Sequence, residues 1–111
     1  MLAKAAASAA DMVIVDLEDA VAPSEKEAAR FVVSDALSSL KWGDRVVAVR
    51  VNDWTSPWTL GDLDAVVAGS AGRLDVVVLP KADDASMVRA TDLVLTQLER
   101  AVGLDAGRIE I

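Results

Sequence analysis

The residues best suited to chemistry are acidic side chains that follow a short apolar run near the amino terminus. Asp16, Glu18 and Asp19 come directly after residues 12–15, a run that is too short for a helix and rich in β-branched side chains. We expect this run to be a buried strand, followed by a turn at Pro23. Because ligands bind at the carboxyl ends of strands in α/β folds, these carboxylates are candidates for a binding site.

Glu18 and Asp19, called the acidic pair below, are adjacent, so in an extended chain their side chains point to opposite sides. One of them would reach the water ligands of a metal ion while the other fixes the loop. The structural alternative is a solvated acidic turn whose charge favours the N-terminus of the following helix. Spacing alone does not separate these two interpretations.

Arg50 lies near the end of a second apolar strand, expected at residues 46–51. By alternation its side chain shares a face with Val46 and Ala48, and a charge in such a run needs a partner. A guanidinium binds carboxylates through a planar, two-pronged fork. Arg50 therefore either clamps a carboxylate or carbonyl oxygen of a substrate or forms a structural ion pair with an acid at a neighbouring strand end.

Two further polar residues follow strand ends. Asn52 comes just after Arg50 and either orients its loop or touches a substrate. Lys81 follows a third expected strand, residues 75–80, and either pairs with the acidic pair or stands exposed in its loop. A Schiff-base role for Lys81 is possible in principle but has little weight.

The elements that position these residues alternate between helices and strands, which predicts βαβ crossovers and a parallel sheet in one α/β domain spanning residues 1–111. The clearest helix begins after Ser24. The spacing of Ser24 and Glu27 predicts a capping box at its start, and Lys26 and Arg30 are expected on the exposed face of the helix. The expected helices and strands are, in order, helix 2–9, strand 12–16, helix 25–40, strand 46–51, helix 60–68, strand 75–80, a helix capped by Asp83 or Asp84 that runs to residue 102, and strand 108–111.

Composition narrows the chemistry further. The 111 residues include no Cys and no His, so disulfides, thiolate nucleophiles and imidazole catalysis are excluded. A metal would need oxygen ligands, which favours a hard cation such as Mg²⁺. The net charge of −7 without a basic cluster argues against nucleic acid and anionic membrane surfaces as partners. No apolar run approaches ~20 residues, so we expect no membrane span and a cytoplasmic location.

Three stretches together resemble one family: DLEDAVAPSEKEAAR at 16–30, VVAVRVND at 46–53 and DVVVLPKADDA at 75–85. In this order and at this spacing they resemble the citrate lyase β-subunit-like lyases of the HpcH/HpaI aldolase family. The resemblance implies a partial (β/α)₈ TIM barrel. The chain would supply βα units two to four and the start of strand five, about half of a barrel of about 250 residues.

The resemblance also implies a Mg²⁺-dependent carbon–carbon lyase. Its substrate would be a 3-hydroxy-acid thioester of the citryl-, malyl- or citramalyl-CoA type, and its products a 2-oxoacid or glyoxylate and an acyl-CoA. The family's matching Arg contacts substrate beside the metal, which makes Arg50 the catalytic candidate and Asn52 a second substrate-binding candidate. Glu18, Asp19 and Lys81 would lie around the metal's water ligands. The direct metal ligands are expected beyond Ile111, so no residue here is assigned as one.

A second interpretation is a non-catalytic half-barrel module that folds by self-association or with a complementary chain. Half a barrel leaves unpaired strand edges and an uncovered inner face, both prone to association, so we expect a homo-oligomer. A third interpretation, a small doubly wound nucleotide-binding domain, is weakened because no glycine-rich loop follows any expected strand.

Overall fold

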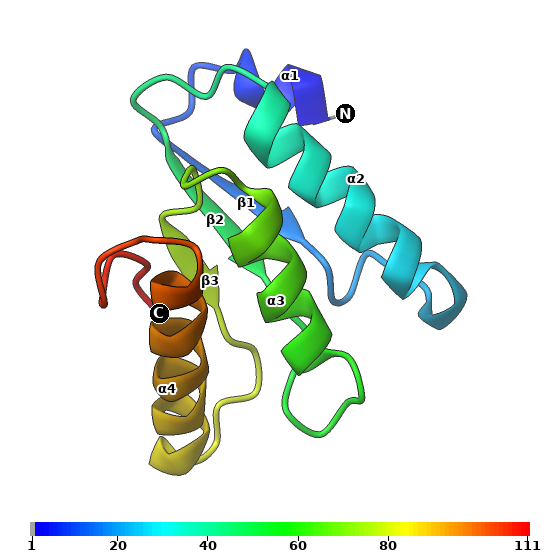
Figure 1. Ribbon diagram of the computed structural model, residues 1–111. Helices are drawn as coiled ribbons and strands as arrows, with labels where there is room; N and C mark the ends of the chain where they lie inside the picture. The colour runs from blue at the N-terminus through cyan, green and yellow to red at the C-terminus, as the bar shows by residue number, and fades with distance from the viewer. Residues whose placement is uncertain (1) are drawn as a thin grey trace.

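Three parallel strands form the centre of the structure, a computed structural model that describes residues 2–111 (Figure 1). Helices and strands alternate along the chain, as the sequence predicts. The elements are α1 (Leu2–Ala6), β1 (Met12–Asp16), the 3₁₀ turn η1 (Pro23–Glu25), α2 (Lys26–Ser39), β2 (Val46–Arg50), α3 (Thr59–Gly69), β3 (Val76–Val78) and α4 (Ala85–Ala101).

The sheet has the order β1-β2-β3 with both pairs parallel, which confirms the predicted parallel α/β arrangement. Its register places Asp16 opposite Arg50 and Arg50 opposite Val78. Because all strands run the same way, their carboxyl ends lie together at one edge. The expected fourth strand is reduced to a single parallel bridge between Val76 and Glu110.

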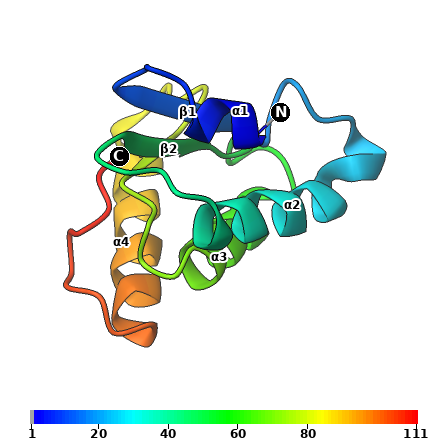
Figure 2. The same ribbon diagram turned by 90° about the horizontal axis from the view of Figure 1, so that it is seen from above.

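Side-chain alternation gives the sheet two unlike faces. The helices α2, α3 and α4 lie on one side of it (Figure 2). On the opposite side Met12, Ile14 and Val46 are 44 %, 56 % and 40 % exposed; these three residues define the open face. The side chains on the helix side belong to the buried core, among them Val15, Val47, Val49 and Val77.

Two glycines let α3 approach α2 closely. A Cβ atom on Gly61 would lie 2.6 Å from the Arg30 guanidinium, and one on Gly69 would lie 2.6 Å from the Ser34 side chain. A larger residue at Gly69 would push α2 away from α3, whereas one at Gly61 would displace the Arg30 guanidinium. The close approach therefore places the first turn of α3 next to Arg30, which matters for the site.

The start of α2 differs from the sequence-based expectation. The predicted capping box is wrong: Ser24 lies inside η1, and neither η1 nor α2 has a side-chain cap. A capping residue needs an extended backbone, and here Ala22, which has no polar side chain, occupies that position. At α4 the expectation holds, because Asp84 accepts a hydrogen bond from the Ser86 amide at 2.6 Å.

A buried carboxylate attaches the last residues to the sheet. Glu99 is 1 % exposed and accepts hydrogen bonds from the amides of Gly107 (3.1 Å) and Ile109 (2.7 Å). These bonds bring Glu110 beside Val76, at the outer edge of β3.

Among the helices of residues 2–111, none has the length and apolar character needed to cross a membrane.

Candidate functional site

The strand ends bring Arg50 and Asp16 into direct contact. Nε of Arg50 donates to Oδ1 of Asp16 at 2.9 Å, and Nη2 donates to Oδ2 at 2.6 Å. The structural ion pair considered from sequence therefore exists. It occupies only one edge of the guanidinium, however. Nη1 donates no hydrogen bond to any residue between 2 and 111, and the Arg50 side chain is 33 % exposed.

The acidic pair converges on the same guanidinium. Oε1 of Glu18 lies 3.9 Å from Nε of Arg50, and Oδ2 of Asp19 lies 3.9 Å from Nη2. The expectation that the two side chains point to opposite sides is wrong, because the backbone is not extended here. The Asp16 carboxylate accepts hydrogen bonds from the amides of Glu18 (2.8 Å) and Ala20 (3.1 Å), which bends the chain immediately after β1.

These contacts separate the pKa values of neighbouring acids. The hydrogen bond from Arg50 is the main reason that the pKa of Asp16 falls to about 2, and the two backbone amides act in the same direction. The pKa of Glu18 is raised, mainly because its carboxyl group shares a hydrogen bond with Asp19 and also because it is partly desolvated. The Asp16 partnership raises the pKa of Arg50 above its ordinary value. Asp16 thus stays ionised at neutral pH, whereas Glu18 holds a proton more readily than a free glutamate.

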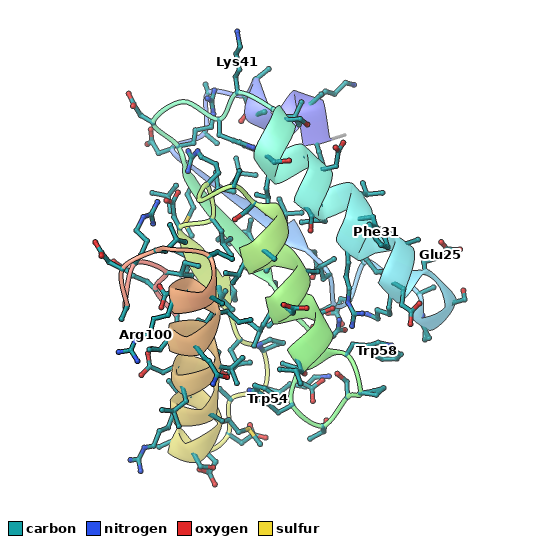
Figure 3. All side chains as sticks on the ribbon, viewed as in Figure 1. Glu25, Phe31, Lys41, Trp54, Trp58 and Arg100 are labelled. Carbon is teal, nitrogen blue, oxygen red and sulfur yellow. The ribbon has the colours of Figure 1, made fainter. Side chains whose placement is uncertain are left out.

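Lys26, the first residue of α2, contacts the backbone of the loop that carries the acidic pair. It is 5 % exposed, and its Nζ donates to the carbonyl oxygens of Leu17 (3.0 Å) and Glu18 (2.6 Å). Nζ also lies 5.4 Å from the centre of the Trp58 ring. Figure 3 shows Trp58 in the loop before α3, beside the first turn of α2.

The expectation that Lys26 and Arg30 lie on the exposed face of α2 is wrong. Arg30 donates from Nε to Asp62 at 2.8 Å and from Nη2 to the Trp58 carbonyl at 2.9 Å. Both residues fall at helical spacing with the buried Val33, so they share its stripe. Their long apolar stems cross the core edge while their charged ends find polar partners.

Asn52 lies beneath the same loop and is 2 % exposed. Its Nδ2 donates to the Leu17 carbonyl at 3.0 Å and to Asp62 at 2.6 Å, and its backbone amide also donates to Asp62 at 2.9 Å. This geometry favours the loop-orienting role of Asn52 over direct contact with a substrate. Asp62, fully buried, joins Asn52 to Arg30 and so ties the two loops together.

Of the two alternatives for Lys81, the structure shows the exposed loop lysine. Its Nζ lies 4.0 Å from Oδ1 of Asp53, and its salt bridge within residues 2–111 is with that residue rather than with the acidic pair. The Lys81 side chain is 64 % exposed. A hydrogen bond from Thr55 lowers the pKa of Asp53, so this acid remains a charged partner for Lys81.

The acids gathered here do not form a complete metal site by themselves. Within residues 2–111 there is no group of three or more acidic side chains arranged to hold a metal ion. Both oxygens of Asp16 are already bound by Arg50 and backbone amides. The acidic pair retains free oxygens, which can accept hydrogen bonds from the water ligands of a hard cation.

Sequence reasoning missed the residues that support the site: Asp53, Asp62 and the buried Lys26. Lys26 carried a usable signal, because it falls on the helical stripe of Val33. Asp62 carried a weaker signal, since it follows Gly61 in the first turn of an apolar helix. The partnership of Asp16 with Arg50 follows once the parallel register is known, because the two residues end adjacent strands.

Comparison with known proteins identifies the family of the chain. The family model described as HpcH/HpaI aldolase/citrate lyase matches residues 1–111. The chain is 41 % identical over 100 residues to an L-malyl-CoA/β-methylmalyl-CoA lyase from Cereibacter sphaeroides. The aligned region covers 90 % of this chain and 31 % of that protein. It is 43 % identical over 98 residues to the citrate lyase subunit β of Escherichia coli, covering 88 % of this chain and 32 % of that protein.

The chain thus spans about a third of the length of the curated relatives that it matches. The three stretches that suggested the resemblance all lie within the match, and each includes the carboxyl end of one strand of the sheet. Because the family model covers its whole length, the chain belongs to the HpcH/HpaI aldolase/citrate lyase family.

Proposed function

We propose that this chain forms part of a Mg²⁺-dependent carbon–carbon lyase. Its substrate is a 3-hydroxy-acid thioester of the citryl-, malyl- or citramalyl-CoA type, which yields a 2-oxoacid or glyoxylate and an acyl-CoA. Family membership supports the reaction class. The observation that carries the proposal is the guanidinium of Arg50, which is fixed at the strand ends by Asp16 and keeps an unoccupied edge.

The free edge of Arg50 suits an oxoacid. Asp16 binds Nε and Nη2 and so fixes the plane of the guanidinium, while Nη1 remains available as a donor. A carboxylate or carbonyl oxygen of the substrate would bind that edge, and the permanent positive charge would stabilise the negative charge that develops as the carbon–carbon bond breaks.

Glu18 and Asp19 contribute oxygen atoms 3.9 Å from Nε and Nη2 of Arg50, the two nitrogens that Asp16 also binds. We assign them to the water ligands of Mg²⁺, because the ion keeps several waters in protein sites and carboxylate oxygens accept hydrogen bonds from them. When bound, the ion supplies Lewis-acid stabilisation of the enolate.

The sheet itself is proposed to be part of a (β/α)₈ barrel. Parallel strands alternate with helices, the helices lie on one side, and the charged residues gather at the carboxyl ends, which is the arrangement of barrel enzymes. On this proposal the open face, formed by Met12, Ile14 and Val46, is the barrel interior. The same exposed apolar surface favours the second candidate, a half-barrel module that associates with a copy of itself.

Calorimetry tests the function. Oxaloacetate is titrated into the purified chain with and without Mg²⁺, and the supported outcome is saturable heat that requires Mg²⁺. The heat should vanish in Arg50→Ala and fall strongly in Arg50→Lys, which keeps the charge but loses the planar fork. Arg89→Ala removes an exposed arginine of α4 as the matched control and should bind normally.

Cleavage is followed separately as glyoxylate released from malyl-CoA. Unchanged binding in Arg50→Ala would overturn the role of Arg50. Absence of heat and cleavage at millimolar ligand, together with a dimer or larger assembly in light scattering, would favour the half-barrel module instead.

A further inference from the structure

The most unusual charge in the structure is the ammonium group of Lys26. The residue is 5 % exposed, and lysine is almost never fully buried without a partner. The partners found for Nζ are two carbonyl oxygens and an aromatic ring, not a carboxylate. Removing an ammonium from water is costly, so these contacts must be geometrically good for the arrangement to persist.

The two carbonyl groups that Lys26 binds are not arbitrary. Leu17 immediately precedes the acidic pair, and Glu18 is its first member, so Nζ holds the two peptide groups on either side of the Glu18 Cα. Asn52 binds the Leu17 carbonyl from another direction. The backbone at Glu18 therefore cannot rotate without breaking these hydrogen bonds. The orientation of this backbone fixes the direction in which the Glu18 carboxylate points.

The support continues away from the site. Asn52 is held by Asp62, and Asp62 by Arg30, which lies one helical turn after Lys26 on α2. Trp58, labelled in Figure 3, contacts both residues of α2. Its ring faces Nζ of Lys26, and its backbone carbonyl accepts a hydrogen bond from Arg30. The first turn of α2 is thus connected to the acidic loop both directly and through α3.

We propose that Lys26 is a positioning residue for the acidic pair: its buried ammonium sets the direction of Glu18 and Asp19 toward Arg50. Its meaning for the reaction rests on the proposed function, whereas its effect on the loop does not. Lys26 itself touches neither substrate nor metal. It acts by holding the backbone from which the two carboxylates project.

The first test measures the loop without any ligand. Lys26→Met keeps the length of the side chain and removes the charge, and Lys41→Met makes the same change at an exposed lysine beyond α2. Amide hydrogen exchange by NMR should show roughly tenfold faster exchange at Glu18 and Ala20 in Lys26→Met. The Leu95 amide inside α4 should keep its protection, and Lys41→Met should change none of the three.

The second test measures coupling to the site. Oxaloacetate affinity in the presence of Mg²⁺ is determined for Lys26→Met, Glu18→Gln and the double variant. If Lys26 acts by placing Glu18, the double variant should bind about as weakly as the weaker single variant, not at the product of both losses. Lys41→Met combined with Glu18→Gln should bind like Glu18→Gln alone.

These measurements separate the two proposals. Loss of local exchange protection with no ligand binding by the unaltered chain would keep the positioning role and reject the function. Normal exchange at Glu18 and Ala20, or independent losses in the double variant, would overturn the positioning role even if the protein is a lyase. Should Lys26→Met fail to fold, Lys26→Gln retains one donor group and should show an intermediate exchange rate by the same measurement.

Discussion

The two ends of the sheet use the same residue types in opposite proportions. At the carboxyl end, the single guanidinium of Arg50 faces three carboxylates and keeps one nitrogen without a partner in residues 2–111. At the amino end, the single carboxylate of Asp75 faces Arg73 and Arg108 and also accepts from the Val47 amide at 2.8 Å.

The difference lies in which donors are already used. Arg73 donates to Asp75 at 2.7 Å and also to the carbonyls of Gly43 and Arg45, so it joins the loops that begin β2 and β3. Arg108 likewise binds backbone carbonyls beside Asp75. A charged cluster whose donors are directed at its own backbone holds the fold together, whereas one with a free edge can bind a ligand.

Among the changes that test this difference between the two ends, Asp75→Ala is expected to have the largest effect on stability. The substitution leaves two arginines and an amide without their shared acceptor, which should lower the free energy of unfolding by about 2–4 kcal/mol. Oxaloacetate affinity of the folded protein should stay within error. Urea unfolding and calorimetry measure the two quantities. A large loss of affinity at unchanged stability would show that the amino end also serves the site.

The second-largest effect is expected from acid, which should lower the free energy of unfolding through Asp16 at the carboxyl end of the sheet. The pKa of Asp16 is lowered from 3.8 to about 2 in the folded protein, so the unfolded chain takes up the proton first. The stabilisation is therefore fully present above pH 4 and is lost as the pH falls toward 2, amounting to about 2 kcal/mol at most. Urea unfolding at pH 5 and pH 2.5 measures the loss.

The matched variant for the acid experiment is Asp16→Asn, which is less stable at pH 5 but should lose less on acidification. Asp75 also has a lowered pKa and contributes a loss of the same sign, so the comparison between the two proteins isolates Asp16. An identical decline in both proteins would mean that the Asp16–Arg50 pair does not stabilise the fold.

The smallest effect is expected from Arg108→Ala. The side chain is 40 % exposed and lies 3.2 Å from Asp75, and exposed ion pairs contribute about 0.2–1 kcal/mol. Its removal should leave ligand affinity unchanged and lower the thermal midpoint by only a few degrees. A cost as large as that of Asp75→Ala would indicate that the arginines at this end act as one unit.

The order of helices and strands was well predicted from the sequence, for reasons visible in single residues. The bounds were less accurate: the helix expected at 2–9 ends at Ala6, and the strand expected at 108–111 is a single bridge. Alternation in residues 46–50 placed Arg50 on the face opposite the core, and Asp84 provided the cap of α4. These features depend on neighbours a few positions apart, and local periodicity records them. The helical start at Ser24 failed because an extra 3₁₀ turn, which sequence spacing does not reveal, moved the first residue of α2.

The details of the site were harder to predict because they depend on contacts distant in the sequence. The direction of the acidic pair follows from a bend imposed by the Asp16 side chain, and its support comes from carbonyl groups, which have no sequence signature. Asp62 lies 32 residues from Arg30, and only the close approach of α2 to α3 brings them together. Residue types thus identified the edge of the sheet but not the network beneath it.

The register of β1 against β2 makes correct folding and site assembly a single event. If β1 slipped by one residue, Val15 or Leu17 would stand opposite Arg50, and the buried Val15 would turn from the core to the open face. The misaligned chain would lose its core packing and its paired charges together. On the proposed function, only molecules with aligned strands would bind an anion at Arg50, so the fraction of ligand-binding protein in a preparation would measure the fraction of correctly folded chains.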